Sequence, residues 1–311
     1  MARANWSTGY FQAEVFRQLL GELGYTVNDP ATLELDPAMF YPDLARGDID
    51  FWANGWFPNH DHFMDEELED GSRFTDRIVP IGTEVAGGGL QGVLVDSATA
   101  SAASITFLGD IGESVETAAL FDTDGDGRAN LVGCDDGWGC QFLLDELIER
   151  NGWSDTIEQD SGAYDELWAD AMTRLEAGEP TLAYTWTPSG YVGEMKPGDG
   201  AVWLSVMSDG DGSGGGIILP PGECPGQPCD LGFEVADIRV VANRDFLSAN
   251  PALDLLFQFV GFQLTDIVLQ NYQMRQGEDS DADIERHATE WIERERRTVD
   301  AWLREVRAAA S

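Results

Sequence analysis

Basic residues are scarce in this chain of 311 residues, and Lys196 is its only lysine. Arginine and lysine together number 18, against 57 aspartates and glutamates, so the formal net charge is −39. A protein that binds nucleic acid through phosphates needs a basic surface, so this class is excluded, and binding to anionic membranes is disfavoured. We interpret the acidity as an adaptation to high salt, which screens repulsion between like charges. The alternatives are neutral drift and a surface that serves solubility.

Long apolar runs are also missing. The most apolar stretch, residues 255–264, is interrupted by Gln258 and Gln263 and is shorter than the roughly 18 residues of a membrane-spanning helix. No apolar segment typical of a secretion signal follows the initial methionine, so none is expected in this sequence. Hydrophobic residues nevertheless make up 43% of the chain, which is enough for a folded core. The length predicts two domains.

The four cysteines lack the Cys-x-x-Cys spacing of zinc ribbons and redox motifs. They form two close pairs, Cys134 with Cys140 and Cys224 with Cys229, separated by spacers rich in Gly and Pro. Such spacers suit short loops closed by disulfides, which persist outside the cytosol. We therefore expect two disulfides and a mature, extracytoplasmic protein from which a leader has been removed.

Apolar periodicity predicts strands alternating with helices, which indicates an α/β protein. Two domains of this class usually bind a ligand in the cleft between them. The predicted helices cover 11–23, 140–150, 164–177, 250–263 and 282–307, and the predicted strands cover 25–27, 48–53, 92–96, 181–186, 201–206 and 237–243.

Most of the ten tryptophans have a structural explanation. Those on apolar helical stripes are predicted to lie in the core: Trp168, Trp291 and Trp302. Trp153 follows a helix-ending Asn-Gly and is predicted to be a packing anchor. Trp52 and Trp203 lie in predicted strands and can point to either face.

Trp56, Trp138 and Trp186 occur instead where strands pass into turns, beside Gly or Pro. The rim of an α/β cleft forms at such positions. Three indoles that converge there would make an electron-rich cage for a quaternary ammonium ion, which has no hydrogen to donate. Trp6 is either a fourth aromatic residue near the cleft or a packing residue.

The most recognisable motif of the chain is Phe121-Asp-Thr-Asp-Gly-Asp-Gly-Arg-Ala-Asn-Leu-Val-Gly-Cys-Asp-Asp-Gly-Trp-Gly-Cys140. Further motifs are Tyr184-Thr-Trp-Thr-Pro188 and the segments 194–198, 202–206, 232–235 and 240–244. In these motifs the chain resembles the substrate-binding proteins of ABC importers for glycine betaine and proline betaine. It departs from the family between Pro58 and His60 and in an inserted-looking Gly-rich segment at 208–229.

This resemblance implies a two-lobed, hinged fold of the type II periplasmic-binding-protein class, with the ligand in the cleft between the lobes. We place lobe 1 at 1–93 plus 238–311 and lobe 2 at 94–237. The resemblance also implies that Trp56, Trp138 and Trp186 surround the ligand's ammonium group. The ligand's carboxylate would be held by the backbone of Gly139 and Cys140 and by His60. Free N–H groups at a helix start suit an anion.

Other polar clusters leave alternatives open. His60-Asp61-His62 could belong to a metal site or to a solvated turn, and His287 is predicted to be structural. Asp122, Asp124 and Asp126 resemble the first half of a calcium loop, but Gly133 stands where the bidentate Glu would be. The alternative is an acidic turn held by Asx hydrogen bonds.

We predict an extracytoplasmic protein that captures glycine betaine and delivers it to a membrane permease and its ATPase. It would be a monomer, without enzymatic activity and without a cofactor beyond a possible structural calcium. Proline betaine, choline, carnitine and dimethylsulfoniopropionate are alternative ligands, although choline lacks the carboxylate. An acid/base enzyme using His60 and a calcium-dependent interaction module are the other classes. The chain has no nucleophile elbow, P-loop or dinucleotide fingerprint.

Overall fold

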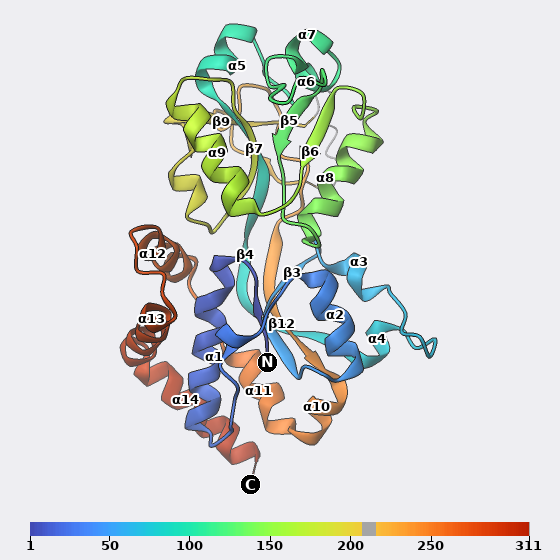
Figure 1. Cartoon of the computed structure of the whole chain (residues 1–311). Coiled ribbons are helices and arrows are strands. Elements are labelled where there is room, and N and C mark those ends of the chain that lie inside the picture. Colours follow the sequence, from blue (N-terminus) through green and yellow to red (C-terminus); the bar gives the residue numbers. More distant parts are fainter. Residues whose placement is uncertain (207–215, 311) are drawn as a thin grey trace. The chain divides into compact units, whose positions relative to one another are not determined.

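The computed structural model describes residues 1–206 and 216–310, in which the chain forms two compact units (Figure 1). Unit 1 contains Met1–Gly89 and Ala236–Ser311, and unit 2 contains Leu90–Val235. The chain therefore passes from one unit to the other twice. Part of the Gly-rich segment at 208–229 lies outside the described residues.

The sheet of unit 1 is antiparallel, with β12 between β3 and the first part of β4. These strands are β3 (Phe51–Phe57), β4 (Ile78–Asp96) and β12 (Ala236–Asn243). In this register Ile238 lies opposite both Trp56 and Val85. A small parallel pair joins β1 (Arg3–Ala4) to β2 (Glu34–Leu35). The predicted strand at 25–27 is not formed, and β3 runs on through Trp56, which the sequence analysis placed after the strand.

The two faces of this sheet are covered by different helices because neighbouring strand residues point to opposite sides. Phe51 packs against Phe16 of α1 and against Phe257 of the C-terminal helix α11 (Pro251–Phe259). Trp52 packs against Phe40 of α2, with ring centroids 4.0 Å apart. Asp36 caps α2 by accepting a hydrogen bond from the backbone N–H of Met39. The helices of this half are η1 (Ser7–Gly9), α1 (Tyr10–Glu22), η2 (Pro30–Thr32), α2 (Pro37–Arg46), α3 (Asp61–Met64) and α4 (Phe74–Arg77).

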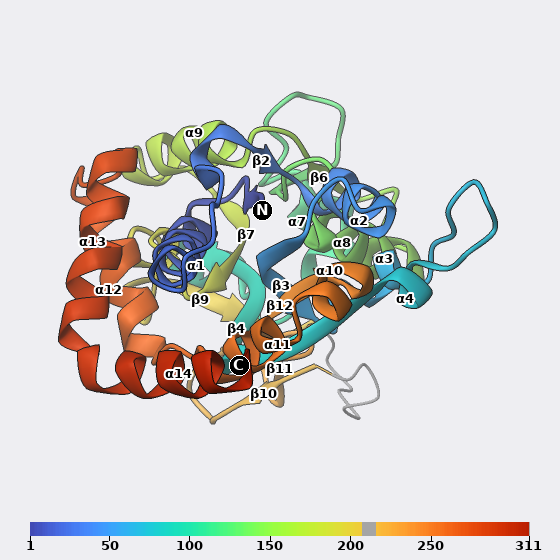
Figure 2. The ribbon, with the colours of Figure 1, turned by 90° about the horizontal axis from the view of Figure 1, so that it is seen from below.

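The C-terminal residues of unit 1 form five helices: α10 (Arg244–Ala249), α11 (Pro251–Phe259), α12 (Leu264–Arg275), α13 (Asp281–Arg294) and α14 (Arg296–Ala309). Two predictions were wrong here. The helix predicted at 250–263 ends at Phe259, and the one predicted at 282–307 is broken at Glu295. After that break α14 buries Val299, Leu303 and Val306, so Trp302 is only partly buried and not a core residue. α13 packs against α1, and α14 packs against α11, beside which it lies in Figure 2.

Unit 2 contains the remaining part of β4 in a sheet of order β4-β7-β5-β6. β7 is antiparallel to β4 and parallel to β5, and β5 is parallel to β6. Its strands are β5 (Ala129–Val132), β6 (Ile157–Asp160), β7 (Leu182–Thr187), β8 (Lys196–Pro197), β9 (Gly200–Leu204), β10 (Ile218–Leu219) and β11 (Cys229–Asp230). Its helices are α5 (Ser97–Ala103), α6 (Gly109–Gly112), α7 (Val115–Ala118), α8 (Gly139–Arg150), α9 (Tyr164–Glu176) and η3 (Tyr191–Gly193).

The parallel arrangement of β5 and β7 positions two of the predicted site residues. Carboxyl ends of parallel neighbours lie at the same edge of a sheet, where α/β proteins bind ligands. β5 leads into the loop that carries Trp138, and Trp186 is the penultimate residue of β7. The topology therefore brings these two residues to one edge, although they are far apart in sequence.

Among the described residues no single helix has the length and hydropathy needed to cross a membrane. Only α11 and α12 taken together pass that test, and they are bent by 82°.

Candidate functional site

Two of the three predicted cage tryptophans meet within unit 2. The ring centroids of Trp138 and Trp186 are 5.6 Å apart and their planes are 84° apart, so the edge of one ring faces the other. Both are buried. Two indoles at right angles form the corner of a box, which is the arrangement that can surround a compact cation on more than one side.

Tyrosines support this corner. The Tyr164 ring lies 5.1 Å from Trp186 and 5.7 Å from Trp138, and the Tyr191 ring lies 5.3 Å from Trp186. The Tyr164 hydroxyl donates to the carbonyl of Tyr184 at 2.8 Å, and the Tyr191 hydroxyl donates to Asp165. These bonds fix the rings behind the indoles. The sequence analysis did not identify either tyrosine, although Tyr191 lies three residues after Pro188 of the motif that contains Trp186.

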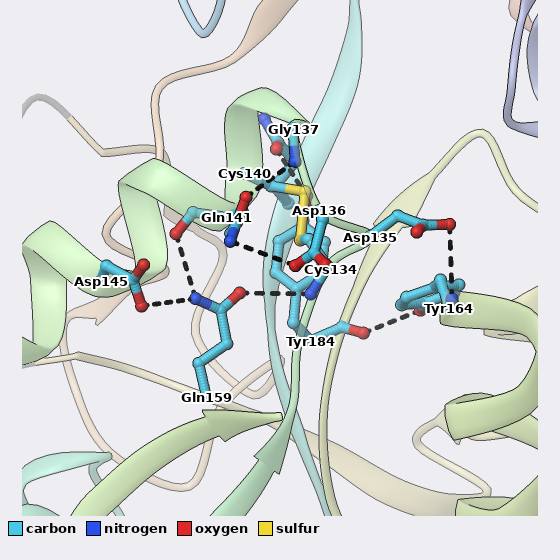
Figure 3. The surroundings of a disulfide bond; sticks show 11 residues. Cys134, Asp135, Asp136, Gly137, Cys140, Gln141, Asp145, Gln159, Tyr164 and Tyr184 are labelled. Atoms are coloured by element: carbon cyan, nitrogen blue, oxygen red, sulfur yellow. Dashed lines mark hydrogen bonds between the residues drawn. A yellow bond between two sulfur atoms is a disulfide. The ribbon is translucent and has the colours of Figure 1, made fainter. Parts of the chain in front are cut away.

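The loop that carries Trp138 is closed by the predicted Cys134–Cys140 disulfide (Figure 3). Hydrogen bonds hold it to its neighbours: Gly137 N–H donates to Gln141 Oε1, and Cys134 N–H donates to Gln159 Oε1. Gln159 in turn donates through Nε2 to the carbonyl of Gln141 and to Asp145. Gly137 has a φ of 83°, a left-handed conformation that glycine adopts without strain. The loop is thus fixed at both ends.

Helix α8 begins directly after Trp138, which is its N-cap residue. Trp138 provides no side-chain cap, and its carbonyl accepts from Gln141 N–H. The N–H groups of Gly139 and Cys140 belong to the first turn, whose donors have no partner inside a helix. Within the described residues these two groups donate no hydrogen bond elsewhere. With the positive end of the helix dipole they can bind an anionic group.

The third predicted cage residue, Trp56, lies in β3 of unit 1 and is held by Asn54. The indole N–H of Trp56 donates to Asn54 Oδ1 at 2.8 Å, and the indole N–H of Trp6 donates to the same oxygen at 2.8 Å. Asn54 has no exposed surface. The Trp6 ring also lies 5.4 Å from Trp52 and 6.3 Å from His60. The sequence analysis did not single out Asn54, because nothing in its spacing indicates that two distant indoles share it.

His60 is buried beside this group, and its protonation follows from its contacts. Its Nδ1 accepts from the backbone N–H of Trp56 at 3.2 Å and lies 3.0 Å from the hydroxyl of Tyr41. Nδ1 therefore carries no proton, and Nε2–H is the donor of the ring. Burial, with His62 nearby, lowers the pKa of His60 to about 3. At neutral pH the ring is an uncharged hydrogen-bond donor.

The predicted alternatives for the other polar residues can now be compared with their contacts. His62 Nδ1 lies 3.0 Å from the carbonyl of Asn59, and burial lowers the pKa of His62 as well. His287 is buried and lies 2.9 Å from Glu278, in a structural contact on α13. Apart from Trp302, the tryptophans for which the sequence analysis gave a structural explanation are all buried: Trp52, Trp153, Trp168, Trp203 and Trp291. The predicted Cys224–Cys229 disulfide is present.

Asp122, Asp124 and Asp126 place carboxylate oxygens within 4.8 Å of one another. Asp122 already accepts from the N–H groups of Gly125 and Gly127, and Asp126 accepts from Arg128 N–H and from the Arg128 side chain. The cluster thus has the hydrogen bonds of an acidic turn, together with the donor set of a divalent-cation site.

Comparison with known proteins identifies the family. Residues 1–294 match the model of the substrate-binding domain of ABC-type glycine betaine transport systems. A glycine betaine-binding periplasmic protein of Dickeya dadantii is 37% identical over 303 residues, covering 96% of this chain and 87% of that protein. A glycine betaine/proline betaine-binding periplasmic protein of Salmonella typhimurium is 34% identical over 302 residues, with the same coverage of both chains.

Solved structures agree on the fold. A choline-binding protein of an ABC transporter, in complex with choline, aligns over 100% of this chain and 98% of its own, with a TM-score of 0.71 and 17% identity. Lactococcal OpuAC, closed on glycine betaine, aligns over 97% of each chain with a TM-score of 0.69 and 14% identity. The α/β fold is that of the two-lobed periplasmic binding proteins, as the sequence analysis predicted.

Members of the matched family bind solutes for transport and are not enzymes, so an acid/base role for His60 in catalysis is set aside. On the match over residues 1–294 and the identity to its relatives, the chain belongs to the family of substrate-binding domains of ABC-type glycine betaine transport systems.

Proposed function

We propose that this protein captures glycine betaine outside the cytoplasm and delivers it to the permease and ATPase of an ABC importer. The observation that carries the proposal is the juxtaposition in unit 2 of an indole corner and a free helix N-terminus. Trp138 lies 5.6 Å from Trp186 and immediately precedes the first turn of α8. A betaine has a trimethylammonium group and a carboxylate one methylene apart, so it needs both kinds of surface side by side.

The cationic end of the ligand is assigned to Trp56, Trp138 and Trp186. Each indole face contributes roughly 0.5–2 kcal/mol to binding a desolvated cation. Three faces supply a large part of the ~8 kcal/mol that corresponds to micromolar affinity. Because the methyl groups cannot donate hydrogen bonds, aromatic faces suit them better than carboxylates do.

The carboxylate is assigned to the N–H groups of Gly139 and Cys140 and to Nε2–H of His60. The first two come from unit 2 and the third from unit 1. The ligand would thus be bound by residues of both units, which act as the lobes. The units divide the chain after Gly89 and after Val235, a few residues from the lobe boundaries that the sequence analysis predicted at 1–93 plus 238–311 and at 94–237. We propose that the two lobes close on the ligand.

The setting of the protein follows from the same proposal. Two disulfides suit an oxidising compartment, and the relatives named above are periplasmic. We propose that the protein acts as a monomer, binds no nucleic acid and needs no cofactor. A net charge of −39 suits work at high salt, where import of betaines protects cells from osmotic stress. A protein most stable in dilute buffer would contradict that last point.

Calcium at Asp122, Asp124 and Asp126 is a second, structural proposal. Backbone N–H groups already occupy Asp122 and Asp126, which favours a turn held by its own hydrogen bonds. Thermal unfolding measured with calcium and with a chelator distinguishes a calcium site from a turn held by its own hydrogen bonds. A melting temperature that rises with calcium and falls in an Asp124→Asn variant would favour the ion.

The function is tested by calorimetric titration of the folded protein at high salt with glycine betaine and then with choline. Micromolar or tighter binding of glycine betaine, with choline at least tenfold weaker, supports both halves of the assignment. Equal binding of choline would retain the cage and contradict the carboxylate site. The wild-type protein and a His60→Phe variant, which keeps an aromatic ring and removes the Nε2–H donor, form the matched pair. The variant should lose affinity for betaine by about tenfold, the worth of a hydrogen bond to a charged group, and not for choline.

A further inference from the structure

One buried amide oxygen joins two tryptophans from distant parts of unit 1. Asn54 Oδ1 accepts the indole N–H of Trp6 and that of Trp56, each at 2.8 Å. An amide oxygen has two lone pairs, so these two bonds fill it. Asn54 is fully buried, and its Nδ2 has no hydrogen-bond partner within the described residues. The oxygen is therefore the functional atom of this side chain.

The geometry of β3 explains why this oxygen controls Trp56. Asn54 and Trp56 are two residues apart in one strand and point to the same face of the sheet. An indole on a strand rotates about two torsions, and a bond from its N–H to a fixed acceptor selects one ring orientation. Gly89 packs against the same ring: a Cβ there would lie 2.7 Å from its Cζ3.

Trp6 has the same acceptor but a different origin. It comes from the N-terminal segment, directly before η1, and its ring lies 5.4 Å from Trp52 and edge-on to His60 at 6.3 Å. It is 7% exposed. Trp6 thus couples the oxygen that holds Trp56 to the aromatic group around His60.

We propose that Asn54 and Trp6 are positioning residues for betaine binding: together they fix the Trp56 indole in its binding orientation before the ligand arrives. This inference rests on the proposed function, because it assigns Trp56 to the ammonium cage. Holding a binding side chain in place in advance removes the ordering penalty from the binding step. Because the N–H group of Trp56 donates to Asn54, Trp56 can present to the ligand only its ring.

The test compares two substitutions of Asn54 that differ in one property. Asn54→Leu keeps the approximate shape and removes the acceptor, and it leaves two indole N–H groups unpaired. Asn54→Asp keeps an oxygen at that position and replaces only the Nδ2 group that has no partner. We expect Asn54→Leu to raise the Kd for glycine betaine by about tenfold or more and Asn54→Asp to stay within about threefold of wild type.

A spectroscopic readout separates positioning from a merely structural role. The indole ¹H–¹⁵N resonances of Trp6 and Trp56 are measured without ligand. Both should move in Asn54→Leu and stay near their wild-type positions in Asn54→Asp. Unmoved resonances in Asn54→Leu, or an unchanged Kd in that variant, would overturn the proposal.

A second pair of variants tests the proposal in case Asn54→Leu does not fold. Trp6→Phe removes one donor and keeps an aromatic ring, and it should raise the Kd about threefold to tenfold. Trp291→Phe is the control, because the Nε1 of this core tryptophan is buried without a partner. Equal affinities for the two variants would contradict the proposal. A wild-type protein that binds no betaine would refute the proposed function instead, while the resonances would still report on the shared bond.

Discussion

The two groups of aromatic residues assigned to the ligand are built in different ways. In unit 2, Trp138 lies within one disulfide-closed loop that leads directly into α8, and Trp186 comes from the neighbouring strand. In unit 1, Trp56, His60 and the acceptor Asn54 lie on one segment, but Trp6, which shares that acceptor, and Tyr41, which contacts His60, come from elsewhere. The unit 2 group has a covalent constraint in addition to its hydrogen bonds, whereas the unit 1 group is held by buried side-chain hydrogen bonds without a disulfide.

This difference has a chemical counterpart. The unit 2 group offers an anion two backbone N–H groups at a helix start, which do not depend on a side chain or on its protonation. The unit 1 group offers one side-chain donor, the Nε2–H of His60, and in the neutral ring its availability depends on the tautomer that the contacts of Nδ1 select. We therefore expect substitutions in unit 2 to weaken ligand binding most. The effects of substitutions in unit 1 should depend more on pH.

The largest effect is expected from the indole corner of unit 2. Trp186→Ala removes one cation–π face and its packing against Trp138 and Tyr164. We expect betaine binding to weaken by about 1–4 kcal/mol, or roughly ten- to several-hundred-fold in Kd. Calorimetric titration measures the change.

Trp291→Ala is the control for Trp186→Ala. This residue packs with Phe11 and Phe262 in unit 1, so its loss should lower stability by about 3–5 kcal/mol and leave the affinity of the folded fraction near wild type. Normal betaine binding by Trp186→Ala would refute the assignment of Trp138 and Trp186 to the ammonium group. The expected difference between the two units would then disappear.

A smaller effect on binding is expected from the covalent constraint. Replacing Cys134 and Cys140 together by Ser opens the loop that carries Trp138. We expect stability to fall by about 2 kcal/mol, from the loop-closure entropy of so short a loop, and the Kd for betaine to rise several-fold. Chemical denaturation and titration measure the two quantities.

The second disulfide provides a matched control for the first. Cys224 and Cys229 close a loop of similar length in unit 2. Their double Ser variant should lose comparable stability and keep its affinity. If both double variants lose affinity equally, the first disulfide has no special role in shaping the ligand site.

The contrast between the units also explains what could be predicted from sequence. The α/β class follows from local periodicity, and the Trp138 loop and α8 are contiguous, so the sequence displays them together. Trp6 and its acceptor Asn54 are 48 positions apart, so their bond left no local pattern. The same limitation explains the predicted helix at 282–307, because its apolar spacing continues past the break at Glu295.

A substitution at Glu84 is expected to have the smallest effect on binding. It tests whether the stability of unit 1 depends on pH. Glu84 is 1% exposed on β4, and within the described residues neither carboxylate oxygen has a partner. Burial raises its pKa well above the usual value, so the folded protein keeps a proton that the unfolded chain releases above about pH 4.5. Stability from this group is therefore lost as the pH rises.

His60 acts in the opposite direction. Its pKa of about 3 lies below that of the unfolded chain, about 6.5, so its contribution to stability is complete above pH 6.5 and is lost as the pH falls towards 3.

We expect Glu84→Gln to be more stable than wild type at pH 7 and to lose this advantage by pH 4, with betaine affinity unchanged. The control is Glu278→Gln, at a partly exposed position in the connection between α12 and α13. Bonds to Arg286 and His287 lower the pKa of Glu278, so this variant should lose stability at pH 7 and not near pH 3. A constant difference between Glu84→Gln and wild type from pH 4 to pH 8, measured by urea unfolding, would mean that Glu84 is ionised in the folded protein. The pH dependence of the stability of unit 1 would then have to come from other groups, such as His60 and His62.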